Sequence, residues 1–524
     1  MTLRTALLPS LAILSLLPLS PARAQVVPKP NCDNVDRIET GMSGETTAAE
    51  IASGANKLGF TCNTQLVGQY QGEGASWQLT AWKNCAYFDQ RLTNTEKNPG
   101  TVVVDVSDPT NPKPTAWLNT PAMLDPWESV KVNPTRQLLA GGQRPTASLN
   151  FPGTGFAIYD ISQDCAHPTL LSSVDFSGSF GHSGQWAPDG KTYYITPLRG
   201  AGPSLEAIDT SDAANPKVIP CGPAGVNGCN AGFWTAQPPL NPTFHDLEFS
   251  KDGNTAYATM FATGATLSAL NGLIILDVSD FQQRRANPAF RVISTLTWDD
   301  GSQGAQNALP ITIAGKPYIL FADEGGNTGS CSQGKSLSGF PRLIDISDPK
   351  NPKTVSKIML DVHDPANCSK FAATNVVSGG PSFFGYSCHY CNVDDVDNAT
   401  KAVCNCFAAG MRIFDIRDPV NPKEIGYFKP PAQGTKLLPG SQYANQGTTG
   451  PTFTRNYDWA TSKVSFPKDR GMPSGDIWTT SQDNGFMVVR MNHLTSGCNN
   501  AGATFGVVAL LALMPLVQRL RRRK

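Results

Sequence analysis

The sequence predicts an all-β protein, namely a seven-bladed β-propeller closed by an N-terminal strand. Three observations predict this fold: a recurring strand-and-turn motif, a hairpin motif between its copies, and an incomplete last copy whose missing strand occurs near the N-terminus. Glycine and proline make up 48 and 41 of the 524 residues, so turns are frequent and long helical patterns are rare. A closed ring of repeats is one domain however long the chain is, so this length does not require several domains.

The recurring motif is a short apolar run, rich in Val and Ile, that ends in an aspartate and precedes Ser-Asp-Pro-x-Asn-Pro or a variant of it. Successive marker aspartates lie 49 to 70 residues apart, which leaves room for the four short strands of a propeller blade. The apolar run suits a strand buried on both faces, and Asp, Asn and Pro favour the turn after it. We therefore interpret the marker aspartates as turn residues and not as a site. They are Asp105, Asp160, Asp209, Asp277, Asp345 and Asp415.

Hairpins between the markers supply two more strands of each unit. Residues 185–196 and 247–258 both have the pattern strand, Asp-Gly turn, strand. The seventh unit, residues 476–490, lacks the marker aspartate and the strand that should follow it, but a matching strand occurs at residues 65–70. We therefore predict that residues 65–70 complete the seventh blade, which would leave the ring without an open edge.

The repeats resemble the LVIVD repeat family of bacterial secreted and surface proteins, which are expected to fold as β-propellers. The resemblance covers residues 65–493. It implies architecture and almost nothing about activity, because propellers serve as binding modules and as several kinds of enzyme. We expect an N-terminal extension over residues 25–64 and the propeller over residues 65–494.

Both ends of the chain have the composition of targeting segments. Residues 1–24 combine a basic start, an apolar stretch and a small-residue cleavage site, which predicts a secretory signal peptide. Residues 495–524 hold Gly497 and Cys498, an apolar run of about 17 residues that predicts a tail helix, and a basic cluster. This order resembles bacterial C-terminal sorting tails, above all the myxobacterial type, and the alternative is a permanent transmembrane helix. We expect an exported protein at the cell surface or the outer membrane, attached to the membrane at least transiently and released once its tail is processed.

The cysteine count supports export. Thirteen cysteines become twelve when Cys498 is assigned to the tail, and an even number in an exported chain predicts up to six disulfides. Cys221 and Cys229 bracket a short loop and form the clearest pair. We expect a Cys-rich insertion at residues 386–408, stapled by disulfides, with a zinc site as the alternative because His389 lies among paired cysteines. The disulfide candidates of this insertion are Cys388, Cys391, Cys404 and Cys406.

Alignment of the blades on their hairpins brings a set of polar residues to one position, eight residues before the hairpin glycine or its equivalent. We expect this position at the start of the innermost strand, at the mouth of the central channel. Imidazole and carboxylate groups suit divalent transition metals and acid–base chemistry, although polar residues also line channels without any ligand. The aligned residues are Glu128, His182, His245 and Asn307.

Around these aligned residues we name candidate roles. Glu128, His182 and His245 are candidate metal ligands, and the tryptophans Trp127, Trp186 and Trp298 are expected to line the mouth. The candidate residues for binding a small molecule are the three candidate metal ligands together with Asn307, Trp127 and Trp186. The remaining histidines fit no common frame and are expected at the surface or in turns; they are His167, His363 and His493.

Charge balance and missing motifs narrow the function. Lys+Arg and Asp+Glu are equal at 42 each, which argues against nucleic-acid binding. The chain shows no catalytic triad with a nucleophile elbow, no P-loop and no dinucleotide fingerprint, so no catalytic residue is assigned. We favour a surface-displayed propeller that binds or adheres to an extracellular protein or small molecule of unknown identity. The alternative is an extracytoplasmic, oxidase-like enzyme with a divalent transition metal at the channel mouth, distantly similar to the selenium-binding/methanethiol oxidase propellers.

Overall fold

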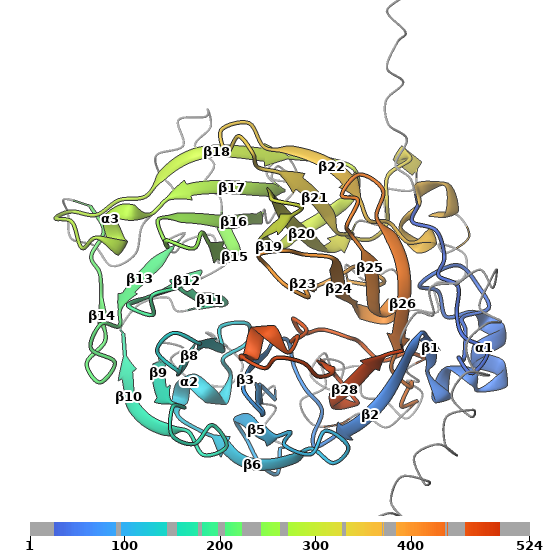
Figure 1. The fold of residues 1–524 in the computed structure, drawn as a ribbon, viewed down its shortest axis with the longest axis horizontal. Coiled ribbons are helices and arrows are strands. Elements are labelled where there is room, and N and C mark those ends of the chain that lie inside the picture. The colour runs from blue at the N-terminus through green and yellow to red at the C-terminus, as the bar shows by residue number, and fades with distance from the viewer. Residues whose placement is uncertain are drawn as a thin grey trace, which may run out of the picture. The chain divides into compact units, whose positions relative to one another are not determined.

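The strands of the computed structural model form seven sheets arranged in a ring (Figure 1). The structure describes residues 26–90, 96–143, 155–176, 181–196, 205–222, 243–261, 271–326, 332–368, 370, 384–434, 438 and 456–492. All of these except Asn492 belong to one unit that ends at Met491. The predicted signal peptide, the predicted tail with Cys498, and His493 lie outside the described residues.

Five blades are antiparallel sheets of four strands that follow one another in chain order. The first strand of each lies innermost and the fourth lies outermost (Figure 1). Blade 1 contains β3 (Leu79–Trp82), β4 (Cys85–Phe88), β5 (Thr101–Asp105) and β6 (Lys113–Leu118), and blade 2 contains β7 (Lys131–Asn133), β8 (Leu138–Gly142), β9 (Gly155–Asp160) and β10 (Thr169–Asp175). Blade 3 contains β11 (Ser183–Trp186), β12 (Thr192–Thr196), β13 (Glu206–Asp209) and β14 (Lys217–Val218), and blade 4 contains β15 (Thr243–Phe249), β16 (Thr255–Phe261), β17 (Gly272–Asp277) and β18 (Arg291–Thr297). Blade 5 contains β19 (Ser302–Ile313), β20 (Lys316–Gly326), β21 (Arg342–Asp345) and β22 (Lys353–Lys357).

The N-terminal segment contributes to the last two blades. Blade 6 contains β23 (Tyr390–Val393), β24 (Lys401–Cys406), β25 (Gly410–Asp415), β26 (Lys423–Lys429) and, outermost, β1 (Phe60–Cys62). Blade 7 contains β27 (Ile477–Ser481) and β28 (Gly485–Met491), with β2 (Thr64–Tyr70) paired to β28. This pairing confirms the predicted closure, because it covers the edge that β28 would otherwise expose. The fifth strand of blade 6 was not expected from the sequence.

The marker aspartates end the third strand of blades 1 to 6 and stabilise the turn that follows. The backbone N–H of Ser107 donates to the Asp105 carboxylate at 2.9 Å, and that of Ser347 donates to Asp345 at 2.7 Å. The strands themselves are buried because neighbouring blades pack face to face. One such core joins Val102 and Val104 of blade 1 to Phe486 and Val488 of blade 7. The interpretation of the motif as buried strand plus turn is confirmed.

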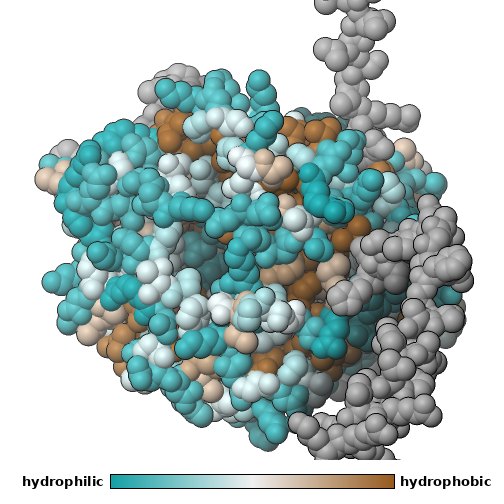
Figure 2. Space-filling view, in the orientation of Figure 1, coloured by the Kyte–Doolittle hydropathy of each residue, from teal (hydrophilic) through white to brown (hydrophobic). Residues whose placement is uncertain are grey.

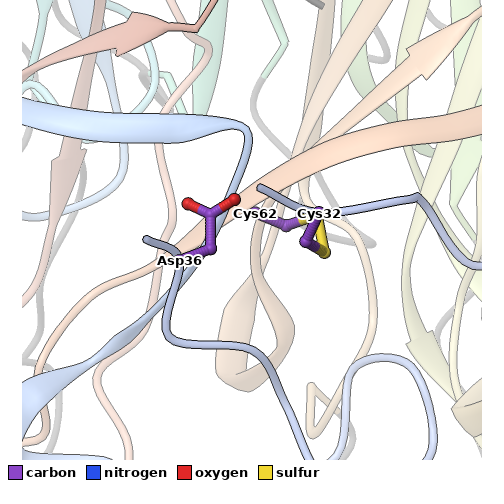
Figure 3. Close-up of side chains that lie close together, drawn as sticks. All are labelled: Cys32, Asp36 and Cys62. Carbon is purple, nitrogen blue, oxygen red and sulfur yellow. A yellow bond between two sulfur atoms is a disulfide. The ribbon is translucent and has the colours of Figure 1, made fainter. Parts of the chain in front are cut away.

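The N-terminal extension is fastened to the outside of blade 6. It carries the short helices α1 (Ala48–Ser53) and η1 (Ala55–Leu58), which lie beside β1 and β26 in Figure 1. A disulfide joins Cys32 to Cys62, with the Asp36 carboxylate nearby (Figure 3). In addition, Glu39 of the extension forms a buried ion pair with Arg412 of β25. These links hold the extension against the ring.

The Cys-rich segment is an ordinary part of blade 6. Two disulfides, Cys388–Cys406 and Cys391–Cys404, join β23 to β24. The zinc alternative is therefore wrong, since all four sulfur atoms are already bonded to one another. The expected insertion is likewise the inner hairpin of the blade, because both strands continue the ladder toward β25.

The other described cysteines are also disulfide-bonded. Cys85 is bonded to Cys165, and Cys221 and Cys368 are also disulfide-bonded. Cys229, the expected partner of Cys221, lies outside the described residues. None of the helices in the described ranges is long and apolar enough to cross a membrane, and the predicted tail helix is not part of those ranges.

Candidate metal centre

Three of the four aligned residues converge where the inner strands begin. Glu128 forms a bridge with Ser183, the first residue of β11, and His182 directly precedes that strand. His245 lies in β15, within an irregularity of the ladder between Phe244 and Leu247. Such irregularities redirect side chains, and they are common beside functional sites. The predicted approach of Glu128, His182 and His245 is confirmed.

The Glu128 carboxylate occupies the centre of this cluster. Its Oε2 lies 3.5 Å from His182 Nε2 and 3.7 Å from His245 Nδ1. Glu128 and His245 are each 1% exposed. The carboxylate is fixed by two further donors, because the side-chain amide of Gln306 and the hydroxyl of Tyr390 donate to Oε2 at 3.1 Å and 3.2 Å.

Two more ionisable residues belong to the cluster; the sequence named His389 only for the zinc alternative, and it gave no sign of Glu324. His389 precedes β23, and its Nε2 lies 3.2 Å from Glu128 Oε1 and 3.4 Å from Glu324 Oε2. Glu324, in β20, also faces His245, with Oε1 3.6 Å from Nε2. The imidazole of His389 is oriented from behind by the backbone carbonyl of Thr461, 2.5 Å from Nδ1. This bond directs Nε2 toward the two carboxylates.

A signal for His389 exists in the sequence. Eight residues after His389 comes Asp397, in the turn between β23 and β24, so His389 fits the frame of the other blades. That turn contains no glycine, so an alignment on the hairpin glycine does not find His389. Glu324 has no such signal, because it lies in β20, the second strand of blade 5, and not at the aligned position of an inner strand.

Asn307 does not take the position that the alignment gives it. The ladder between β19 and β20 is irregular between Ala305 and Asn307, so Gln306 is the residue that reaches Glu128. Asn307 pairs with Ala322 in the ladder and is buried, and none of the described residues hydrogen-bonds its side chain. The alignment was therefore wrong by one residue in blade 5.

The tryptophans divide into two groups. Trp127 belongs to the cluster: its indole N–H donates to His182 Nε2 at 3.2 Å, and its φ of 52° is unusual for a bulky residue. Trp186 packs in the core between blades 2 and 3, and its N–H donates to the carbonyl of Lys131. Trp298 donates to Asp323 and stacks on the Arg342 guanidinium. The expectation that Trp186 and Trp298 line the mouth is thus wrong, because both are used in packing within and between blades.

The remaining described histidines differ from one another. His167 is an exposed turn residue paired with Asp164, as expected. His363 is fully buried, and its ring nitrogens contact the backbone N–H of Leu360 and the carbonyl of Tyr386. The expectation of a surface position for His363 is wrong, because it fills a structural role inside the protein.

Charge in the cluster is distributed unevenly. Burial opposes ionisation of Glu128, but the imidazoles of His245 and His182 hold the pKa of its carboxyl well below the usual range. Burial raises the pKa of Glu324 and lowers that of His245. Burial also opposes protonation of His389, yet its hydrogen bonds to Glu128 and Glu324 raise its pKa to about 9. The raised pKa of His389 therefore favours a positive charge beside the two carboxylates.

Three donor atoms of the cluster have the spacing of a partial coordination shell. Glu128 Oε2 lies 3.5 Å from His182 Nε2 and 3.7 Å from His245 Nδ1, and both distances are long for hydrogen bonds. The other ring nitrogen of His245 faces Glu324, and an imidazole binds a given ion through one nitrogen, so Glu324 lies beside this set and not within it. Donors bound at about 2.0–2.2 Å to one metal are separated by about 3.0 Å in an octahedral site and about 3.4 Å in a tetrahedral one. One ligand atom each from Glu128, His182 and His245 lies within 4.8 Å of the others. These three groups could hold a metal ion.

A second group of metal-ligand types does not form such a centre. Cys32, Asp36 and Cys62 lie together in the N-terminal extension (Figure 3). The two sulfur atoms form a disulfide, and the Asp36 carboxylate accepts hydrogen bonds from the backbone N–H groups of Asp33 and Asn63. This group is a structural staple.

Comparison with known proteins finds one family match and several distantly similar structures. A family model described as the LVIVD repeat matches residues 96–119, and no curated protein matches the chain. Similar solved structures include a β-propeller domain from Myceliophteria thermophila, with 10% identity, coverage of 81% of this chain and 98% of that one, and a TM-score of 0.46. They also include the periplasmic gluconolactonase of Pseudomonas aeruginosa, with 12% identity, coverage of 69% and 96%, and a TM-score of 0.43. Similarities this distant carry no argument about function. On its own strand order and family match, the chain is a seven-bladed β-propeller that carries the LVIVD repeat.

Proposed function

We propose that this protein is an exported metal-dependent enzyme with one divalent transition-metal ion at the mouth of the central channel. The observation that carries the proposal is the convergence of three ligand groups at the starts of neighbouring blades, with one ligand atom of each within 4.8 Å of the others. Two imidazoles and one carboxylate form a mixed nitrogen and oxygen set, which suits Fe²⁺, Cu²⁺, Mn²⁺ or Zn²⁺. The three groups belong to Glu128, His182 and His245, and Glu324 and His389 lie beside them.

Charge favours a metal over a purely polar lining. Two carboxylates face each other deep in the protein, and no lysine or arginine of the described residues forms an ion pair with either one. Buried charge is costly unless it is paired or bound to a metal. A divalent cation bound by Glu128 would balance the buried carboxylate charge.

The exposure of His182 and the closure of the ring without a metal favour a catalytic role of the metal over a structural one. The side chain of His182 is 19% exposed, compared with 8% or less for the other four groups, so an outside molecule could approach from its side. The ring is already closed by β2 and does not need a metal for closure. A redox-active ion here would support oxidase chemistry, and Zn²⁺ would support hydrolysis by a bound water.

The adhesion function favoured by the sequence has weaker support. Exposed large apolar residues such as Leu58, Leu170 and Val420 come from separate elements, and hydrophobic patches are scattered on the face shown in Figure 2. Contiguous apolar surface is what usually marks a docking face. Export itself is supported, because all ten described cysteines are disulfide-bonded and disulfides persist in oxidising compartments.

Metal analysis of the full chain, produced with export so that the disulfides form, tests the proposal. We expect about one transition-metal ion per chain after loading with Co²⁺, and d–d absorption bands that shift on addition of azide, which would show an exchangeable position. The double variant His182→Ala/His245→Ala should lose the metal while its circular dichroism is unchanged. His167→Ala, at an exposed turn, is the matched control and should bind as the wild type does.

Two results would contradict the proposal. Equal metal content in the double variant and the wild type would return the cluster to a polar channel lining. Bound metal that azide never reaches would make the centre structural, and the enzyme assignment would fail.

A further inference from the structure

A cavity of about 260 Å³ lies farther along the inner strands than the cluster. At about 30 Å³ per water molecule, it has room for roughly nine waters. In blades 2 to 6, its wall contains the residue three positions after the inner-strand start, so it occupies a different level of the same channel. Lys131, Gln185, Glu248, Leu309 and Asn392 of this wall follow Glu128, His182, His245, Gln306 and His389 by three residues.

Most charged and polar groups of this wall already have partners. The Lys463 ammonium lies 2.6 Å from Glu248 Oε1, and the Gln185 amide donates to Glu248 Oε2 at 2.8 Å. The Asn392 amide donates to the Asp469 carboxylate at 2.7 Å. These pairs need no ligand to be satisfied.

Lys131 is the charged exception among the described wall residues. It is only 6% exposed, it lines the cavity, and its ammonium has no hydrogen bond or ion pair with any residue in the described part of the chain. Its nearest recorded interaction is with the ring of Tyr390, whose centre lies 5.5 Å from Nζ. Asp246 and Glu248 favour the charged form only from a distance, and burial lowers the pKa of the amine. A buried cation without a bonded partner is costly, so an anion in the cavity would be stabilised there.

The rest of the wall is suited to an organic molecule more than to a bare inorganic ion. Apolar side chains of Leu79, Val132 and Leu309 line the same cavity as Lys131. Ligand sites commonly combine an apolar wall with one or a few fixed polar groups that orient the ligand. The wall thus offers one cationic anchor and an apolar surface beside it.

We propose that this cavity binds a small organic carboxylate, whose carboxylate group pairs with Lys131 and whose apolar part lies against Leu79, Val132 and Leu309. Tyr390 separates the two levels, since its hydroxyl bonds Glu128 of the cluster and its ring faces Lys131. This carboxylate site is independent of the proposed metal centre, because none of the candidate metal ligands contributes to it.

Titration calorimetry of the full chain with benzoate tests this site. We expect benzoate to bind and Lys131→Met to weaken binding by about 10-fold or more, as expected for loss of a charge-assisted hydrogen bond. Benzamide, which has the same shape without the charge, should be weakened to the same degree in the wild type. Lys131→Arg keeps the charge and should keep most of the affinity, while Lys251→Met removes an exposed lysine and should change nothing.

Three results would overturn the proposal. Benzoate would fail to bind at 10 mM, roughly the weakest affinity that one ion pair in a cavity would give. Alternatively, benzamide would bind as tightly as benzoate, or Lys131→Met would bind benzoate as the wild type does. Retention of benzoate binding in His182→Ala/His245→Ala would show that this site stands whether or not the metal centre exists.

Discussion

At the starts of the inner strands, Glu128 and Glu324 face three imidazoles, whereas three residues farther along, Glu248 is paired with Lys463 and bonded to Gln185. Both levels are lined by residues at equivalent positions of the same repeats. The first level leaves carboxylate charge to be balanced by a proton or a metal. The second balances Glu248 within the wall and leaves the Lys131 cation without an ion pair among the described residues. The repeat therefore supplies equivalent positions, and the side chains placed there decide what each level can bind.

The largest expected effect comes from removing the central carboxylate of the cluster. Glu128→Gln should lower the affinity for a divalent transition metal by at least about 1,000-fold, because even residues outside the ligand shell typically change affinity 10- to 100-fold. Glu248→Gln, three positions later than His245 in blade 4, should leave metal affinity unchanged. Competition titration against a chromophoric chelator measures both. An equal loss in the two variants would erase the distinction between the two levels.

A carboxyl that is buried without neighbouring imidazoles shows by contrast how the imidazoles act on the pKa of Glu128. Burial raises the pKa of Glu206, in β13, to about 7 from 4.5. Its carboxyl therefore keeps a proton in the folded state between these pH values, so the stability it confers is present below pH 4.5 and is lost as the pH rises through 7. Glu206→Gln should match the wild type at pH 4 and exceed it at pH 8 by up to about 3 kcal/mol.

Urea unfolding at the two pH values measures this difference. The Gln variant carries no titrating group at that position, so its advantage should grow steadily between the two values. If the difference between the proteins is the same at both pH values, burial does not hold the proton on Glu206. The contrast with Glu128, whose pKa the imidazoles lower, would then lose its physical basis.

The disulfides of blade 6 should affect the cluster, and the disulfide of the N-terminal extension should not. Cys391–Cys404 staples the strand that follows His389, whereas Cys32–Cys62 lies in the extension. Replacement of either pair by serine should cost about 3 kcal/mol of stability, from the entropy of the closed loop. Only the blade 6 variant should also weaken metal binding, by about 10-fold, because His389 would be less firmly oriented. Comparable metal affinities in the two variants would show that the staple has no part in the site.

The smallest expected effect has the opposite sign. The Trp127 indole N–H occupies the lone pair of His182 Nε2 in the metal-free protein, so a metal that binds this atom must break that hydrogen bond. Trp127→Phe keeps a ring and removes the donor, and it should therefore increase metal affinity by about 5-fold, the equivalent of one neutral hydrogen bond. Trp298→Phe, whose N–H donates to Asp323 between blades, should not increase it. Weaker metal binding in Trp127→Phe would mean that the indole positions His182 and does not compete with the metal.

Much of the fold could be predicted from the sequence because it depends on local chemistry. Each marker aspartate makes its turn with a residue two positions away, and each apolar run is buried by its own composition. The closing strand β2 was also predictable, since the last blade visibly lacked one. The fifth strand of blade 6 was not, because nothing in residues 60–62 indicates which sheet edge they will meet.

By itself, the sequence determined the ring, its closure, and three members of the cluster, because a strict repeat places equivalent residues at equivalent depths. The tertiary structure alone decided the rest of the cluster. It added His389, whose glycine-free turn hid the frame, and it replaced Asn307 by Gln306 through one ladder irregularity. It also brought in Glu324 from a second strand and buried Lys131 without a bonded partner in the described chain. These features depend on the curvature and packing of several blades at once, and a spacing rule within one repeat contains no information about them.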